Sequence, residues 1–233
     1  MDNYWKSFGT SVRGPGHVRS GTPNQDSFLT LRRRWGDVVV VSDGVGSHKT
    51  SEYGSRAACL SVYYAAKEWK DTNTDTLISS IQSNWLSFIR PFDPQKSAAT
   101  CLFAIRRNTD IILGMLGDGL ISVLRRDGSY FEMIENKDVC FSNQTSALSE
   151  KTQIDSWHLI KIDPNVCNAI LLCTDGVADD LLPNKRIDFI RHIYEQSKKY
   201  SICKIYRELK SMLENWPVPK HSDDKTIACL FRL

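Results

Sequence analysis

Three aspartates follow aliphatic runs, and each of them is followed at once by glycine. Asp43 comes after Val-Val-Val-Val-Ser, Asp175 after Ile-Leu-Leu-Cys-Thr, and Asp118 after Ile-Ile-Leu-Gly-Met-Leu-Gly. A carboxylate at the end of a buried strand loses hydration, and several brought together repel one another. A divalent cation compensates both effects, and ligands that are all oxygen favour hard ions such as Mg²⁺ or Mn²⁺. These aspartates are therefore candidate metal ligands.

An Asp-Gly pair is also a common turn, so each pair taken singly is a weak signal. Asp127-Gly128 separates two strand-like runs at 122–126 and 129–134. We interpret that pair as the two-residue turn of a hairpin, without a role in chemistry. The three other pairs carry weight only through the order of motifs along the whole chain.

The elements that would position these aspartates are short strands and paired helices. Two helical blocks are expected from apolar residues at helical spacing, at 51–69 with 74–90 and at 184–198 with 202–215. Strands are expected at 27–33, 37–42, 99–107, 111–116, 122–126, 129–134, 157–162, 169–174 and 226–233. Strands in adjacent groups and helices in adjacent pairs argue against alternating βαβ units. The pattern predicts an α+β fold, a four-layer αββα sandwich of two central antiparallel sheets flanked by helix pairs, in a single domain spanning 1–233.

Composition narrows the function classes. The chain has 233 residues, 41% hydrophobic and 24% charged, with a formal net charge of +3. We expect a soluble protein that binds neither nucleic acid nor membrane, because no basic patch and no long apolar run is present. The seven cysteines are odd in number and form no CxxC pair, and the first ten residues have no signal-peptide pattern. A reduced, cytoplasmic location is the expectation.

Motifs of nucleophilic catalysis are missing from the sequence. It contains no GxSxG elbow, no HExxH pair and no Walker-type phosphate loop. The sequence therefore gives no sign of a covalent intermediate on the protein. One polar stretch without periodicity, 135–156, is expected to be a long surface loop, and such loops are often functional.

Six motifs in order resemble those of the metal-dependent protein serine/threonine phosphatases of type 2C (the PPM family), in a bacterial-like form. The first three are Asn24-Gln25-Asp26, Asp43-Gly-Val-Gly-Ser-His48 with Glu52 and Gly54-Ser55 after it, and Ala98-Ala-Thr100. The others are Gly117-Asp118-Gly119, Leu-Leu-Cys-Thr-Asp175-Gly-Val-Ala-Asp179, and Asp223-Asp224-Lys225-Thr226. Together they cover nearly the whole chain, and the ordered set is specific where each motif alone is loose.

The resemblance implies a metal-dependent phosphoprotein phosphatase that uses two Mn²⁺ or Mg²⁺ ions and a possible third. Asp43 would bridge two metals, with the carbonyl of Gly44 as a further ligand. Asp175 and Asp223 would complete one metal's shell, and these two with Asp43 are the predicted catalytic residues. Asp26 would reach the other metal through water. Asp118 and Asp179 match positions that, with Asp175, hold a third cation in several bacterial members, and 135–156 falls where the family carries a flap.

The sequence departs from the family pattern at the phosphate contact and near the bridging aspartate. Gln25 replaces a Glu, and Val45 stands where eukaryotic members have a proposed general-acid His. The family's phosphate-binding Arg usually lies at the position of Gly21, so Arg19 and His17 are the substrate-binding candidates, with Arg13 as another. Expected partners are a phosphoprotein substrate and a cognate serine/threonine kinase. Two alternatives stay open at this point: a non-catalytic pseudophosphatase that binds phosphoproteins, and a phosphatase of small metabolites.

Overall fold

The computed structural model describes residues 4–46, 50–70, 73–135 and 146–233. Two five-stranded antiparallel sheets lie face to face, in the orders β1-β10-β9-β6-β7 and β2-β3-β4-β5-β8. Their strands are β1 (Trp5–Val12), β2 (Ser27–Arg33), β3 (Gly36–Ser42), β4 (Cys101–Arg106), β5 (Ile111–Leu116), β6 (Leu120–Arg125), β7 (Tyr130–Ile134), β8 (His158–Ile162), β9 (Cys167–Cys173) and β10 (Lys225–Arg232).

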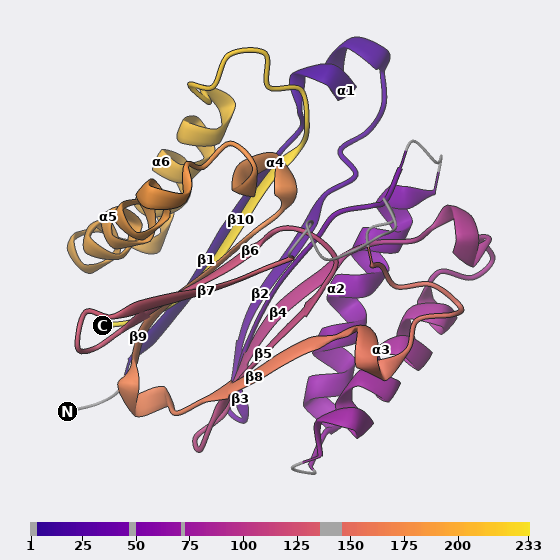
Figure 1. Cartoon of the computed structure of the whole chain (residues 1–233), viewed down its shortest axis with the longest axis horizontal. Helices are drawn as coiled ribbons and strands as arrows, with labels where there is room; N and C mark the ends of the chain where they lie inside the picture. Colours follow the sequence, from indigo (N-terminus) through magenta and orange to yellow (C-terminus); the bar gives the residue numbers. More distant parts are fainter. Residues whose placement is uncertain (1–3, 47–49, 71–72, 136–145) are drawn as a thin grey trace.

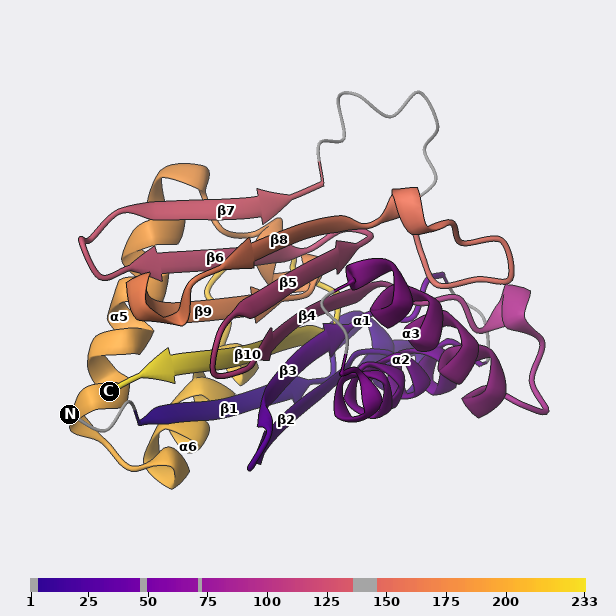
Figure 2. The same cartoon turned by 90° about the horizontal axis from the view of Figure 1, so that it is seen from below.

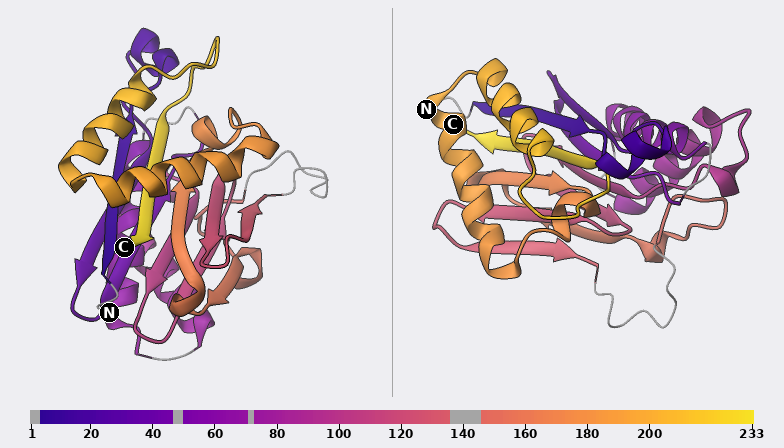
Figure 3. Two further views of the ribbon diagram at one scale, coloured as in Figure 1. Left: turned by 90° about the vertical axis from the view of Figure 1, so that its left-hand side faces the viewer. Right: turned by 90° about the horizontal axis from the view of Figure 1, so that it is seen from above.

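Helices cover the outer face of each sheet (Figures 1 and 2). The helices α2 (Ser51–Glu68) and α3 (Thr74–Phe88) lie on the sheet that contains β3, and α5 (Arg186–Lys199) with α6 (Ile202–Glu214) lies on the sheet that contains β10. Figure 3 shows α5 and α6 crossing the strands of that second sheet. Two shorter helices, α1 (Pro15–Ser20) and α4 (Asp175–Ala178), lie at one end of the sandwich (Figure 1). The predicted four-layer αββα fold is confirmed.

Alternation within β3 explains the layering. Val38 and Val40 belong to the apolar cluster shared with α2 and α3, while Val39 and Val41 belong to the cluster between the two sheets. All four are fully buried, so this strand is apolar on both faces. The run of four valines in β3 is thus explained, because alternate valines pack against the helices on one face and against the other sheet on the opposite face.

Three of these elements were missed, and one predicted element was partly wrong. The strand β1 and the short helices α1 and α4 were not predicted, and the helices α2 and α3 end at 68 and 88, one or two residues earlier than expected. In the expected loop at 135–156, residues 136–145 lie outside the described residues. The rest is not all surface, because Leu148 is fully buried and bridges Ala99.

The prediction of a single domain over 1–233 stays a prediction. Within the described ranges, no helix has the length and apolarity needed to span a membrane.

Candidate active site

Strand register brings the predicted aspartates to one end of the sandwich. Ser27 pairs with Ser42, so Asp26, just before β2, lies beside Asp43, just after β3. On the facing sheet, the backbone N–H of Thr174 donates to the carbonyl of Thr226, so the residues around Asp175 meet those that precede β10. This pairing brings together aspartates that are far apart in the sequence.

The third Asp-Gly pair joins the same end through β6. Leu120 pairs with Cys173, which places the turn before β6 next to the end of β9. Asp118 occupies that turn between Gly117 and Gly119, whose φ angles of 93° and 120° lie in the region that favours glycine. Asp179 ends the single turn of α4, where its N–H donates to the carbonyl of Asp175 at 2.9 Å. Residues four apart on a helix share a face, so Asp179 lies over Asp175.

Burial and mutual proximity raise the pKa values of several of these carboxylates. Burial, followed by the negative charges of Asp26 and Asp175, raises the pKa of Asp43 well above its usual value, and Asp223 adds to the effect. Burial also raises the pKa of Asp26 from 3.8 to about 7, with a smaller contribution from Asp224. At neutral pH such a cluster is costly unless protons or cations balance its charge.

Asp175 connects the two halves of the cluster. Its pKa is raised from 3.8 to about 7 by burial first and then by the charges of Asp118, Asp223 and Asp179. A cavity of about 260 Å³ has Asp175, Asp179 and Asp223 in its lining, together with Asp180 and His221. All six predicted metal-binding carboxylates therefore lie within electrostatic reach of either Asp43 or Asp175.

The backbone around Asp43 is held rigidly. Thr100 accepts from the N–H of Asp43 through Oγ1 at 2.9 Å and donates its own N–H to the Asp43 carbonyl at 2.8 Å. Gly44 forms a bridge with Ala99, and a Cβ atom at Gly44 would lie 2.6 to 2.7 Å from Ser51. Only glycine fits so close to the first turn of α2.

The carboxylates are oxygen ligands of the type that a hard cation prefers, and several of them accept hydrogen bonds from protein donors. Thr174 Oγ1 donates to Asp26 at 2.8 Å, the N–H of Gly176 donates to Asp175 at 2.7 Å, and the N–H of Asp224 donates to Asp223 at 2.9 Å. Among the residues described here, no three His, Cys, Asp or Glu side chains are placed to hold one ion as they stand. Asp26 and Asp43 also share a side-chain hydrogen bond, which needs a proton on one of the two carboxyls. Ion binding therefore requires loss of that proton and side-chain rotation on an already fixed backbone.

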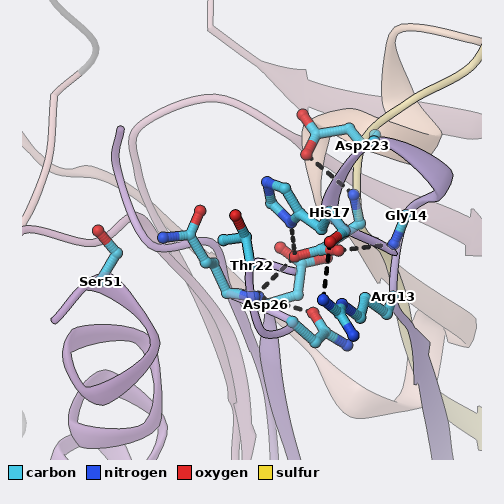
Figure 4. Close-up of polar contacts among 12 residues, drawn as sticks. Arg13, Gly14, His17, Thr22, Asp26, Ser51 and Asp223 are labelled. Atoms are coloured by element: carbon cyan, nitrogen blue, oxygen red, sulfur yellow. Dashed lines mark hydrogen bonds and ion pairs between the residues drawn. The ribbon is translucent and has the colours of Figure 1, made fainter. Parts of the chain in front are cut away.

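The two substrate-binding candidates lie on α1 and differ in their surroundings. The His17 ring donates through Nδ1 to the carboxylate of Asp224 at 2.8 Å, and Figure 4 shows His17 beside Asp223. Arg19 is exposed, and within the described ranges it forms no hydrogen bond or ion pair. Arg13 is exposed as well and donates to the carbonyl of His17 at 2.7 Å. Only His17 of these three is bonded to the segment that carries Asp223.

Sequence reasoning missed two charged residues beside the cluster. Lys225 is almost fully buried, and its Nζ lies 3.6 Å from Asp180 and 3.4 Å from the carbonyl of Asp223. Glu135 has its pKa raised by burial and then by the charge of Asp118. Lys225 follows two aspartates and precedes the apolar run that begins at Ile227, and this position was the signal for the first; no local pattern signals the second.

Comparison with known proteins decides the family. A model of the protein phosphatase 2C family matches residues 13–214. The chain belongs to the protein phosphatase 2C family. The prediction of a phosphoprotein phosphatase that depends on a metal is confirmed by this membership. A comparison with curated protein sequences gives no significant match.

Solved structures share the fold of this phosphatase 2C chain at low sequence identity. The catalytic domain of the serine/threonine phosphatase PstP, in complex with two manganese ions, has a TM-score of 0.70 at 15% identity, covering 98% of each chain. RsbX in complex with magnesium has a TM-score of 0.65 at 16% identity, covering 100% of this chain and 97% of its own. PppA, a regulatory component of T6SS in Pseudomonas aeruginosa, has a TM-score of 0.69 at 15% identity, covering 99% and 98%.

Proposed function

We propose that this phosphatase hydrolyses phosphoserine and phosphothreonine in proteins, with Mn²⁺ or Mg²⁺ held by the aspartate cluster. The observation that carries the proposal is the meeting of Asp26, Asp43, Asp175 and Asp223 at one end of the sandwich, with raised pKa values at the first three. The family membership and the metals in the PstP and RsbX structures support the choice of cofactor.

Each residue has a role in this proposal. Asp43 would be shared by two ions, with the Gly44 carbonyl as a further ligand. Asp175 and Asp223 would hold one of these ions, and Asp26 would hold the other through water. Asp118 and Asp179, with Asp175, would hold a third ion. A pair of divalent cations would supply Lewis acidity and a water of lowered pKa for attack on phosphorus.

The protein contributes orientation and charge balance. Thr100 and the close packing of Gly44 fix the backbone of Asp43, so only side-chain rotation and loss of a proton are needed on binding. His17, held by Asp224 at the edge of the cluster, orients a phosphoryl oxygen of the substrate, and Arg19 on the exposed side of α1 contributes positive charge. Val45 has no titratable group, so the side chain two residues after Asp43 does not protonate the leaving group.

The proposal also covers the partners of the protein and its location. We propose phosphoproteins and a cognate serine/threonine kinase as partners, and a cytoplasmic location. The cysteines at 59, 101, 167, 173, 203 and 229 are all free, as in a reducing compartment.

Turnover of an aryl phosphate and of a phosphothreonine peptide, with and without Mn²⁺, tests the activity. We expect turnover of both with metal and none after removal of metal by chelator. Full turnover in chelator refutes the metal mechanism. Phosphopeptide binding without turnover at any metal concentration favours the pseudophosphatase alternative, and turnover of the aryl phosphate alone favours a small-metabolite substrate.

A further inference from the structure

Asp224 is a buried carboxylate that accepts three hydrogen bonds from distant parts of the chain. Its Oδ1 accepts from the backbone N–H of Gly14 at 2.7 Å. Its Oδ2 accepts from the backbone N–H of Gln25 at 2.6 Å and from Nδ1 of His17 at 2.8 Å. The residue is 1% exposed; its bonds to Gly14 and Gln25 are buried, and its bond to His17 is partly buried. Charge-assisted bonds of this length are the strong class of hydrogen bond.

These bonds join three segments of the proposed active site. Gln25 immediately precedes Asp26, Asp224 immediately follows Asp223, and Gly14 with His17 belongs to the start of α1. The contact at Gly14 is so close that a Cβ atom there would lie 2.2 to 2.4 Å from Asp223 and Ser222 backbone atoms. Figure 4 shows Gly14 and His17 beside Asp223.

The bond to Asp224 also fixes the state of the His17 ring. Since both oxygens of Asp224 already accept from backbone N–H groups, the carboxylate acts as an acceptor and Nδ1 of His17 is the donor. In a histidine, the bond made by one ring nitrogen determines the role left for the other. Nε2 of His17 forms no hydrogen bond in the parts of the chain that are described, so it is the ring nitrogen left for a ligand.

We propose that Asp224 is a positioning residue, which holds His17 on α1 and the segments of Asp26 and Asp223 in one geometry. This inference rests on the proposed function, because it assigns His17 to the substrate side and the two aspartates to the metal side. Asp224 itself touches neither metal nor substrate. Its effect is transmitted through His17 and through the backbone of Gln25.

Substitution by Asn tests the carboxylate without a change of shape. An amide has one acceptor oxygen, so Asp224→Asn leaves at least one of the three buried donors unpaired or facing an N–H group. The matched control is Asp37→Asn. Asp37 is likewise 1% exposed and bonded, to Arg106 Nε at 2.6 Å, but it lies at the other end of β3 from Asp43.

The experiment is a double-variant cycle on wild type, His17→Ala, Asp224→Asn and the pair combined. KM and kcat for a phosphothreonine peptide, Mn²⁺ affinity by calorimetry and Tm in chelator are measured for each, with Asp37→Asn alongside. We expect Asp224→Asn to raise KM and weaken Mn²⁺ binding by roughly 10- to 100-fold, the range for residues that orient ligands. The combined variant should have a KM no higher than Asp224→Asn alone, because His17 is already released there. Asp37→Asn should lower Tm and leave KM and Mn²⁺ affinity unchanged.

Other outcomes overturn the proposal. If the KM effects of the two single variants multiply in the combined one, His17 and Asp224 act independently. If Asp224→Asn lowers only Tm, as the control does, its role is purely structural. An inactive wild type refutes the proposed function instead. In that case Mn²⁺ affinity still decides the positioning role, which survives only if Asp224→Asn weakens binding and Asp37→Asn does not.

Discussion

Removal of metal from this protein should give its stability an unusual dependence on pH. The carboxyls of Asp26 and Asp175 have pKa values raised from 3.8 to about 7, and burial raises the pKa of Asp43 well above its usual value. The folded state therefore binds protons that the unfolded chain has released between about pH 4 and 7. In chelator, stability should be highest at the acidic side of this window and should fall as the pH rises through 7.

The size of the effect follows from the raised pKa values. For Asp175 alone, the difference between 3.8 and about 7 corresponds to on the order of 4 kcal/mol, at 1.36 kcal/mol for each tenfold change. Only the part of this interval between pH 5 and 7 lies in the measured range, which corresponds to roughly 3 kcal/mol. In a domain of this size 1 kcal/mol moves Tm by about 2–4 °C, so Asp175 alone should lower Tm by about 5–10 °C between pH 5 and pH 8. Saturating Mn²⁺ should abolish the decrease, because a bound cation favours the ionised carboxylates.

Asp43→Asn is the decisive perturbation. It removes a buried carboxyl whose own pKa is raised by burial and by the charges of Asp26 and Asp175, so in chelator at pH 8 the variant should have a higher Tm than wild type and a weaker dependence on pH. With Mn²⁺ it should gain little stability and show no turnover, since one bridging ligand is lost. Asp163→Asn, an exposed cap that accepts from the N–H of Asn165, serves as the control and should behave as wild type in both tests.

Differential scanning calorimetry from pH 5 to 8, in chelator and in Mn²⁺, measures these effects. The reasoning is refuted if Tm in chelator is constant or rises with pH over this range. It is also refuted if Asp43→Asn is less stable than wild type in chelator at pH 8, because the cluster would then not be under repulsion.

Three further predictions concern the surroundings of the cluster. Gly44→Ala should lower Tm by several degrees and reduce Mn²⁺ affinity, because its Cβ would lie 2.6 to 2.7 Å from Ser51; calorimetry checks both, and an unchanged protein would mean that α2 shifts freely. Asp118→Ala and Asp179→Ala should each lower turnover by about tenfold or more while two ions stay bound, as steady-state rates and binding stoichiometry would show. Loss of all metal binding would place either residue in the two-ion core instead. Shortening the stretch 135–156 should reduce turnover of a phosphopeptide much more than turnover of an aryl phosphate, and equal losses would assign that stretch to support of the metal site.

The aspartates at strand ends could be predicted because their signal is local. An aliphatic run followed by a hydroxyl residue, Asp and Gly marks Asp43 and Asp175 whatever the rest of the chain does. The long valine run likewise predicted a strand buried on both faces. The meeting of these strand ends was expected only through the resemblance, since register between β9 and β10 joins residues more than 50 positions apart.

Features that depend on distant partners were not predictable in this way. The strand β1 has the polar sequence Trp-Lys-Ser-Phe-Gly-Thr-Ser-Val, and it is ordered by pairing with β10, more than 200 residues later. Asp224 was taken as part of a motif, without a role, because its donors Gly14, His17 and Gln25 lie about 200 residues before it. No periodicity or spacing in a single sequence encodes a contact of that range.

In this fold the backbone around the aspartates is held in place while their side chains can rotate, and this links the stability of the protein to its metal binding. Thr100 and Asp224 hold the main chain around Asp43, Asp26 and Asp223 through bonds that do not involve the candidate metal-binding oxygens of Asp43 and Asp26. The two sheets therefore keep the aspartates close together in spite of their repulsion. Binding of protons or of cations can reduce this repulsion without any change of strand register. Protonation below about pH 7 competes with metal for the same oxygens. Mn²⁺ affinity should accordingly weaken as the pH falls from 8 to 6, over the same range in which the metal-free protein becomes more stable.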